Sequence, residues 1–242
     1  MNSQDEPQAV ARRYARRAAN AAGAGSDRYS PLQPDVWQTL QERQRALLGL
    51  FAQQGVKELG ALRLTEVGCG SGGNLLELLR LGFAPERLQG IELLPERCAQ
   101  ARHALPSAIT IWQGDAADRA QAPVQAGSQD LVLQSTVFSS LLDDAFQQHL
   151  AHAMWRWLRP GGAVLWYDFT FDNPRNPDVR GVTLARVRAL FPASRISHRR
   201  VTLAPPLARA VCRLHPSLYS AFNLLPLLRT HRLAWIEKPH AP

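Results

Sequence analysis

Thr65-Glu66-Val67-Gly68-Cys69-Gly70-Ser71-Gly72-Gly73-Asn74 is the stretch that decides the fold of this chain. An apolar run, 62–67, leads into its glycines, and an amphipathic run, 75–81, follows them. This order predicts a strand, a tight glycine turn and a helix. Glycine adopts positive φ without a Cβ penalty, and it lets a ligand lie against backbone N–H groups at the positive end of the following helix. The stretch therefore predicts a site for a nucleotide-sized ligand.

Length and composition indicate one globular α/β unit. The chain has 242 residues, 45% of them hydrophobic, which is enough for one α/β domain with its own core. Its three cysteines, Cys69, Cys98 and Cys212, form no CxxC pair, so we expect neither a disulfide framework nor a metal site. There is no apolar signal core and no apolar run of about 18 residues, so we expect a cytoplasmic protein.

The net charge of +8 is concentrated near the C-terminal end. Residues 180–242 contain ten arginines and one lysine but a single carboxylate, Glu237. The preceding residues carry slightly more acids than bases. Local asymmetry of this kind points to an anionic partner for the C-terminal region.

Strands and helices alternate along most of the chain. Helices are predicted at 7–22, 34–53, 74–81, 95–105, 143–158 and 184–191, and strands at 62–67, 87–92, 109–112, 130–134, 163–169, 195–203 and 231–237. This alternation predicts right-handed βαβ units and a mostly parallel sheet. We expect a single domain with an N-terminal helical cap (1–58), a cofactor-binding core (60–170) and a C-terminal part (171–242). The C-terminal part would hold an acceptor loop, a basic helical insertion and the last strands.

Two classes of nucleotide fit the glycine turn. Gly68, Gly70 and Gly73 have the spacing GxGxxG, and Glu92 follows where a dinucleotide fold places its ribose-binding acid, so an NAD-dependent oxidoreductase is one alternative. Glu66, however, stands two residues before a GxGxG pattern, where a carboxylate can hold the loop or receive the ammonium end of an amino-acid-bearing nucleotide. Gly114-Asp115-Ala116 offers a carboxylate and a backbone N–H to an adenine edge. A helical lead-in, which can fold over a cofactor, also distinguishes this chain from such dehydrogenases.

Four ordered motifs resemble those of class I S-adenosylmethionine-dependent methyltransferases, in particular the branch with quinone and other small-molecule methyltransferases. The motifs are Glu66–Gly72, Gly90-Ile91-Glu92, Gly114-Asp115-Ala116 and Leu158-Arg159-Pro160-Gly161-Gly162. The resemblance covers about residues 60–170. It implies a Rossmann-like α/β fold with seven strands in the order 3-2-1-4-5-7-6, the last one antiparallel, helices on both faces and a helical insertion before the last strand. It also implies S-adenosylmethionine as cofactor and S-adenosylhomocysteine as product.

The resemblance further implies roles for the motif residues. The loop at the methionine end of the cofactor would be formed by Glu66, Gly68, Cys69, Gly70 and Gly72. Glu92 would accept both ribose hydroxyls and Leu93 would pack on the adenine. Asp115 and Ala116 would bind the adenine edge, and Gln134 would border the methyl group. The alternative for Glu66 is a loop cap, for Glu92 a solvated turn, and for Cys69 a small side chain that simply fits.

The methyl acceptor is expected beyond the carboxyl ends of the fourth and fifth strands. Asp168 and Asp172 are the candidate general bases there, and a base is needed only for a poorly acidic hydroxyl or a protonated amine. The loop 168–180 is polar and contains two Asn-Pro pairs, so it would contact a polar acceptor or simply satisfy its own turns.

Segment 205–228 alternates apolar clusters with Arg209 and Arg213. It fits a helical hairpin on the sheet edge, a lid, an interfacial helix attracted to anionic lipid, or a surface for RNA. We expect O- or N-methylation of a small-molecule, glycan or lipid- or phosphate-linked acceptor, with peripheral contact to an anionic membrane. RNA methylation is an alternative that we disfavour, because no RNA-binding module accompanies the core and the Asn-Pro-Pro-Tyr type motif is absent after the fourth strand. The oligomeric state stays open.

Overall fold

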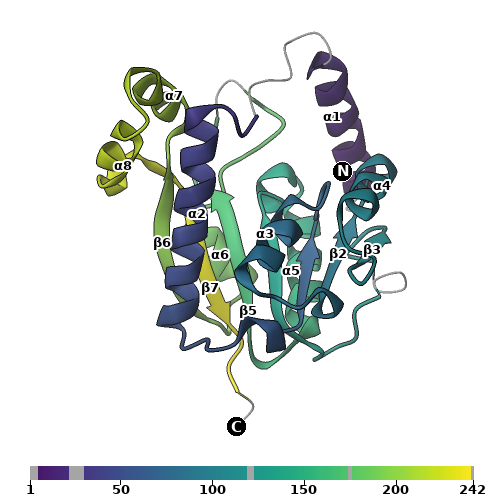
Figure 1. Cartoon of the computed structure of the whole chain (residues 1–242). Coiled ribbons are helices and arrows are strands. Elements are labelled where there is room, and N and C mark those ends of the chain that lie inside the picture. The colour runs from purple at the N-terminus through teal and green to yellow at the C-terminus, as the bar shows by residue number, and fades with distance from the viewer. Residues whose placement is uncertain (1–4, 22–29, 119–122, 174–175, 241–242) are drawn as a thin grey trace.

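A seven-stranded sheet forms the centre of the computed structural model, which describes residues 5–21, 30–118, 123–173 and 176–240 (Figure 1). The strands are β1 (Leu64–Val67), β2 (Leu88–Glu92), β3 (Thr110–Gln113), β4 (Gln129–Ser135), β5 (Leu158–Phe169), β6 (Arg195–Leu203) and β7 (Arg229–Glu237). Their order in the sheet is β3-β2-β1-β4-β5-β7-β6. β7 is antiparallel to both β5 and β6, and the remaining pairs are parallel. The predicted strand order and the antiparallel last strand are therefore confirmed.

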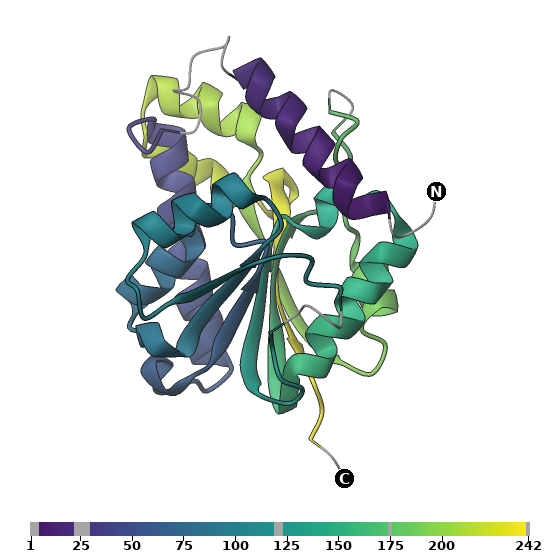
Figure 2. The same cartoon turned by 90° about the vertical axis from the view of Figure 1, so that its right-hand side faces the viewer.

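Helices cover both faces of the sheet, which Figure 2 shows nearly edge-on. One face carries α2 (Pro34–Gln53), α3 (Gly73–Leu81) and α4 (Pro95–Ala104), and the other carries α5 (Asp144–Trp157) and α6 (Leu184–Leu190). Each face has its own core, built around residues such as Leu75 and Leu133 on the first and Trp157 and Trp166 on the second. The sequence makes this possible because β4 and β5 are buried on both faces at their centres, where each has a continuous apolar run, 131–133 in β4 and 163–167 in β5.

α1 (Glu6–Ala21) stands apart from these two layers. It crosses the end of the sheet where the parallel strands finish, above the loops that follow β1, β2 and β4 (Figure 2). Val10 of α1 is buried against the same core as Val67 and Phe138. The predicted helix at 7–22 is thus observed one residue earlier, with its last predicted residue outside the described part of the chain. Of the predicted helical cap (1–58), α1 lies over the site end of the sheet, whereas α2 covers one of its faces.

The chain between β6 and β7 is the predicted helical insertion. It forms α7 (Pro205–Leu214), α8 (Leu218–Asn223) and the short 3-10 helix η6 (Pro226–Leu228). A small core of its own, centred on the fully buried Tyr219, packs it beside α2 and β6. Within the described residues, no helix is long and apolar enough to cross a membrane.

Most predicted boundaries are shifted by one or two residues, and the largest difference is at the start of β5. The turn expected at Arg159–Gly162 lies inside β5, which begins at Leu158. Leu158 pairs with Gln129 and Ala163 with Leu131, so residues 159–162 bulge out opposite Asp130. Gly161 takes φ +75°, and its N–H donates to the Lys238 carbonyl oxygen at 2.9 Å. The bonds to the chain just after β7 hold this segment in the sheet.

Candidate functional site

A cavity of about 800 Å³, part of it open to solvent, lies at the carboxyl ends of β1, β2 and β4, beneath α1. Five of the predicted cofactor residues line it: Gly68, Glu92, Leu93, Asp115 and Ala116. Open α/β sheets bind ligands at this edge, where the strand order reverses between β1 and β4.

The glycine turn has the backbone that its sequence predicts. Gly68, Gly70 and Gly72 take φ values of +63°, +57° and +89°, a region that other residues avoid. A Cβ on Gly68 would lie 2.7 Å from Val137 Cγ2, and one on Gly72 would lie 2.8 Å from Leu105 Cδ1. A Cβ on Gly70 would meet no atom closer than 3.8 Å. Glycine at 68 and 72 is thus required by both conformation and packing. At Gly70 only the conformation requires glycine, and there is free space beside its backbone.

Glu92 ends β2 and holds the glycine turn. Its Oε2 accepts the Gly70 N–H at 2.7 Å, and its Oε1 accepts the Leu94 N–H at 2.9 Å. The side chain is buried in the wall of the cavity. A buried carboxylate with two oxygens at the edge of a cavity can accept two hydroxyl donors of a ligand, as predicted for the ribose.

Asp115 follows β3 and also lines the cavity. Its Oδ1 accepts the Ala117 N–H at 2.8 Å, which fixes the turn that presents Ala116 to the cavity. Burial is the main cause that raises the pKa of Asp115 above its ordinary value. Leu93 and Ala116 supply apolar contact area beside these two carboxylates. The combination of apolar walls with two carboxylates suits a nucleoside.

Glu66 lies beside the cavity rather than in its lining. The side chain is completely buried, and its Oε1 accepts a hydrogen bond from Asn74 Nδ2 at 2.5 Å. Its Oε2 has no hydrogen-bond partner among the described residues. Burial raises the pKa of Glu66 to about 8. A free buried oxygen at this place fits an incoming N–H donor such as the ammonium group of an amino-acid-bearing nucleotide.

Cys69 and Gln134 have structural surroundings. Cys69 is buried in the core beneath the turn, where burial raises the pKa of its thiol, and it does not line the cavity. Gln134 accepts the Val137 N–H at 3.1 Å and is fully buried, so it braces the loop after β4. Both stay predictions as cofactor contacts.

Thr136 directly follows β4 and lines the cavity with Ser135 and Val137. It takes φ +57°, which is strained for a β-branched residue. Its N–H donates to the Tyr167 carbonyl oxygen at 2.8 Å, and its Oγ1 donates to the Ser135 carbonyl oxygen at 2.7 Å. Strain of this kind is usual where a chain is held in position for function.

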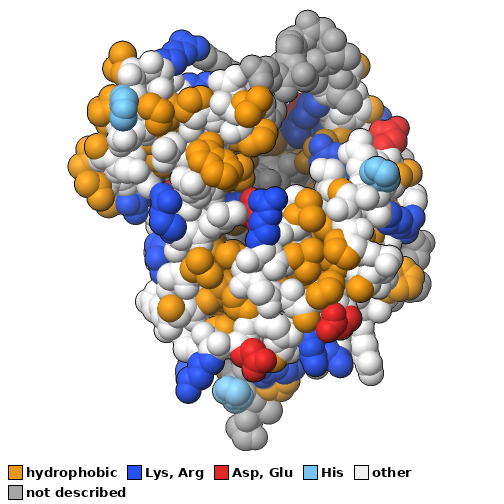
Figure 3. All heavy atoms as spheres, in the orientation of Figure 1, with side chains coloured by type: hydrophobic (Ala, Val, Ile, Leu, Met, Phe, Trp, Pro, Cys, Tyr) orange, Lys and Arg blue, Asp and Glu red, His pale blue; other side chains and the backbone are white. Residues whose placement is uncertain are grey.

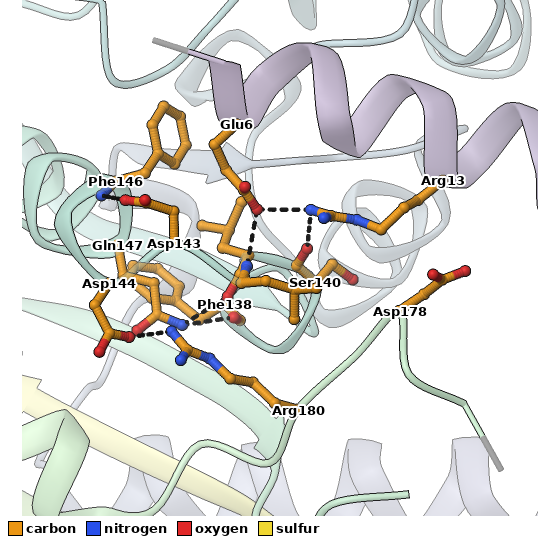
Figure 4. Close-up of polar contacts among 12 residues, drawn as sticks. Glu6, Arg13, Phe138, Ser140, Asp143, Asp144, Phe146, Gln147, Asp178 and Arg180 are labelled. Atoms are coloured by element: carbon orange, nitrogen blue, oxygen red, sulfur yellow. Dashed lines mark hydrogen bonds and ion pairs between the residues drawn. The ribbon is translucent and has the colours of Figure 1, made fainter. Parts of the chain in front are cut away.

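α1 closes the cavity from above. Pro7, Val10 and Tyr14 line it, and the Arg97 guanidinium lies 4.4 Å from the centre of the Tyr14 ring. Figure 4 shows the contact that holds the start of the helix: Arg13 donates to Glu6 Oε1 at 2.6 Å and to the Ser140 carbonyl oxygen at 2.9 Å.

The same Glu6 oxygen accepts the Leu142 N–H at 2.8 Å. Glu6 and Arg13 are both buried. Further along the helix, Arg16 and Arg17 both contact Asp178 of the loop after β5. The first helix is therefore attached to the loops that follow β4 and β5.

A second, smaller cavity of about 380 Å³ lies on the α2 face of the sheet and shares Ser135 with the first. It lies between Arg43 of α2, Asn74 and Glu77 of α3, and Tyr167 of β5. Arg43 is paired with Glu77 at 2.7 Å and lies 5.4 Å from the centre of the Tyr167 ring. Because Asn74 also holds Glu66, this cavity lies beside the predicted methionine end of the cofactor.

The two predicted bases lie in different surroundings. Asp168 is fully buried, and its carboxylate accepts N–H groups from Ser139 at 3.1 Å and Phe169 at 3.0 Å. Burial raises the pKa of Asp168 to about 7. Asp172 is exposed, and its Oδ1 accepts the Gly181 N–H at 2.8 Å. Neither Asp168 nor Asp172 lines either of the two cavities, so their role as general bases stays a prediction. Pro174 and Arg175 of the predicted acceptor loop lie outside the described residues.

Several residues of the site escaped the sequence analysis. They are the α1 residues Pro7, Val10 and Tyr14, the α4 residue Arg97, and the residues Ser140, Leu141, Phe146 and Leu150 around the start of α5. Val10 and Tyr14 are four residues apart, which places them on one face of the predicted helix, but no local signal identifies what that face covers. Ser140 and Leu141 reach the cavity only because the chain turns through a 3-10 helix, η5 (Phe138–Ser140), after β4.

Comparison with known families assigns the central part of the chain. Residues 65–162 match a family model described as a methyltransferase domain. This segment runs from β1 into β5 and includes the glycine turn, Glu92 and Asp115. A search of curated protein sequences found no significant match.

Several solved structures of similar fold are S-adenosylmethionine-dependent methyltransferases. One from Archaeoglobus fulgidus has a TM-score of 0.58 at 12% identity and aligns over 82% of this chain and 96% of its own. One from Mesorhizobium loti has a TM-score of 0.56 at 17% identity, over 80% and 98%. Geranyl diphosphate C-methyltransferase from Streptomyces coelicolor, solved with Mg²⁺, geranyl diphosphate and S-adenosyl-L-homocysteine, has a TM-score of 0.57 at 14% identity, over 81% and 77%.

Proposed function

Because the chain carries a methyltransferase domain of the class I, S-adenosylmethionine-dependent type, we propose that it methylates an amphipathic, lipid-linked acceptor at an anionic membrane surface. The resemblance stated from the motifs is confirmed by the family match and by the strand order. The NAD-dependent alternative is set aside on the same grounds. The acceptor class is our proposal, and it depends on the surface beside the cavity.

The residues of the cavity suit S-adenosylmethionine. Glu92 would hold the ribose hydroxyls, Asp115 the adenine edge, and Glu66 the ammonium group, for which its free oxygen is suited. When bound, S-adenosylmethionine supplies a methyl group on a positively charged sulfur, ready for in-line displacement. The protein aligns the acceptor and excludes water, and α1 serves the second purpose by covering the cavity.

The acceptor side begins at Ser135, which lines both cavities. Leu47, Leu133 and Leu165 form apolar walls of the smaller cavity, and its polar groups are Asn74, Ser135, Tyr167 and the ion pair of Arg43 with Glu77. It suits an apolar ring or chain next to a group that can be methylated. A base is needed only if that group is a weakly acidic hydroxyl or a protonated amine.

The observation that carries the lipid-linked acceptor is an exposed apolar surface on α7, α8 and η6. Leu214, Leu224 and Leu227 are 80%, 76% and 85% exposed. Figure 3 shows hydrophobic side chains gathered over α7 and α8, and this surface belongs to the same end of the molecule as α1. Soluble surfaces rarely gather so many large apolar side chains without a partner.

The charge of the same segment selects the kind of partner. Arg213 is exposed and Arg209 half-buried on α7, and residues 181–236 contain no carboxylate at all. An amphipathic helix with arginines and exposed leucines binds at the interface of an anionic bilayer. An RNA-binding surface would not need the leucines, so the structure gives the RNA alternative less support than the lipid one.

Two experiments test the proposal. Co-sedimentation with phosphatidylglycerol vesicles should retain the wild-type protein and lose the double variant Leu224→Asp/Leu227→Asp, while Leu32→Asp, an exposed leucine outside α7 and α8, serves as the control. In the second, a cell extract is incubated with the protein and methyl-labelled S-adenosylmethionine. Label in the lipid phase supports the acceptor class, and label confined to the aqueous phase contradicts it.

A further inference from the structure

Arg232 of β7 is a buried arginine without a carboxylate partner. Its side chain is 8% exposed, and its Nη1 lies 2.7 Å from His198 Nδ1 on β6. Its Nε is buried and has no hydrogen-bond partner among the described residues. None of the carboxylates in the described part of the chain lies within salt-bridge distance of it.

Two further arginines surround this group. Arg200 on β6 is the direct antiparallel partner of Arg232, so both side chains leave the same face of the sheet. Arg188 belongs to α6, which packs on that face. The pKa of Arg232 is lowered first by burial and then by the charges of Arg200 and Arg188, and the pKa of His198 is lowered by burial and by all three arginines.

The carboxylates nearest in the sheet are engaged elsewhere. Asp168 is the β5 partner of Arg232, but it accepts N–H groups from Ser139 and Phe169. Asp172 accepts the Gly181 N–H, and Asp178 pairs with Arg16. Burying a guanidinium without a counter-charge destabilises the folded state, and like charges close to one another add to that cost. An anion bound among the three arginines would remove both penalties.

We propose that Arg188, Arg200, Arg232 and His198 form a binding site for a phosphoryl group. Several guanidinium groups around one point suit a tetrahedral oxyanion with two negative charges, because each presents a fork of donors to its oxygens. His198 and Arg188 are exposed and Arg200 is half-buried, so the group can enter from solvent. This site is separate from the cofactor cavity and does not depend on the proposed acceptor.

The place of the site in the sheet connects it with the ligand edge. Arg200 lies near the carboxyl end of β6, and Arg232, near the start of β7, pairs with Asp168 at the carboxyl end of β5. In the sheet, β6 is three strands away from β4. Three inter-strand spacings amount to about 14 Å. A phosphoryl group bound here would therefore belong to a molecule that also reaches toward the loop after β5, where Phe171 lies 5.9 Å from the Arg200 guanidinium.

Titration calorimetry with inorganic pyrophosphate at low salt tests the site. Saturating S-adenosylhomocysteine should be present, so that the cofactor cavity cannot provide the binding. The wild-type protein should bind pyrophosphate, and Arg188→Ala and Arg200→Ala should each weaken binding roughly tenfold or more, as expected for a lost charge-assisted hydrogen bond. Both residues reach solvent, so these variants should fold, and circular dichroism checks that they do.

Arg199→Ala is the matched control, since Arg199 is on the same strand but faces the opposite side, where it donates to Gln53. Equal pyrophosphate binding by all four proteins would overturn the proposal. In a second arm, phosphatidylcholine vesicles with phosphatidic acid replace pyrophosphate. The proposal would also be overturned if pyrophosphate did not bind and the variants bound these vesicles as the wild type does. Loss of binding by Arg188→Ala and Arg200→Ala in this arm alone would identify the phosphoryl source as a lipid headgroup, and loss with pyrophosphate would identify a soluble phosphate.

Discussion

The side-chain amide of Asn74 donates a hydrogen bond to the buried carboxylate of Glu66 at 2.5 Å, and the second oxygen of that carboxylate has no partner among the described residues. One hydrogen bond does not replace the water that an ionised carboxylate loses on burial, and the pKa of Glu66 is raised to about 8. The native protein without cofactor therefore keeps a proton at this position at neutral pH. Ionisation would be favoured again by a cationic ligand group at the free oxygen.

Glu66→Gln should change how stability depends on pH. The native state holds a proton up to about pH 8, whereas the unfolded chain releases it near 4.5, so this group stabilises most below pH 4.5 and its contribution is lost as the pH rises toward 8. The slope reaches about 1.4 kcal/mol per pH unit between the two values. Urea unfolding without cofactor measures the free energy of unfolding of both proteins. As the pH rises from 5 to 8, this free energy should increase for the variant relative to the wild type, by at most about 1.4 kcal/mol per pH unit. A difference that stays constant over this range would show that Glu66 does not titrate there.

Glu92→Gln should weaken binding of S-adenosylhomocysteine. The carboxylate at the end of β2 has two oxygens for hydroxyl donors, and an amide keeps only one acceptor. Lost hydrogen bonds to a charged group reduce affinity by roughly 10- to 100-fold. Titration calorimetry measures this, with Glu96→Gln, an exposed glutamate four residues further on, as the control. Equal affinity of Glu92→Gln and Glu96→Gln would contradict the ribose role.

Arg13→Met should loosen α1 and speed the release of cofactor. The change removes the ion pair with Glu6 and the bond to the Ser140 carbonyl oxygen, and it leaves the Glu6 carboxylate buried without its counter-charge. Breaking a buried pair costs about 3–5 kcal/mol, so detachment of the helix becomes the cheaper state. Stopped-flow measurement should show a dissociation rate at least about tenfold faster. Arg12→Met, at an exposed position of the same helix, should leave the rate unchanged.

Asp168→Asn and Asp172→Asn separate a positioning role from a base. Asp168 holds the Ser139 N–H at 3.1 Å behind the cavity, so its replacement should lower the free energy of unfolding by about 1–3 kcal/mol. Asp172 is exposed, and its replacement should cost less than about 1 kcal/mol. Single-turnover methyl transfer to the labelled lipid fraction gives the second reading. A rate loss of Asp172→Asn without loss of stability would assign it as the base, and near-normal rates for both would exclude a base at either position.

The sheet could be predicted because its strands are local patterns. The apolar runs before Gly68 and Gly114 predicted individual strands, and the resemblance of the four motifs to class I methyltransferases implied the order of seven strands that is observed. Within the site, the residues that could be predicted directly follow β1, β2 and β3, where the chain position determines the place in space. Glu92 and Asp115 were identified for this reason.

The rest of the site depends on long-range packing. Glu6 and Arg13 contact the Ser140 and Leu142 backbone more than 120 residues away, and nothing in their own helix indicates that partner. The positive φ of Thr136 is equally hidden, since its sequence contains no glycine or asparagine. Asp168 faces the core instead of the cavity because side chains alternate between the two faces along β5. Its distance in sequence from the Leu158–Gly162 motif does not indicate which face it takes.

Gly72→Ala and Gly73→Ala test whether the turn needs glycine at one position more than at the next. Gly72 has φ +89°, and a Cβ there would lie 2.8 Å from Leu105 Cδ1, whereas a Cβ on Gly73 would meet nothing within 4 Å. The left-handed conformation alone costs alanine about 1–2 kcal/mol, and the contact with Leu105 adds to it. Gly73 begins α3, where alanine is the better helix former by up to about 1 kcal/mol. Urea midpoints should therefore fall for Gly72→Ala and stay level or rise for Gly73→Ala, and equal losses for both would contradict this account of the turn.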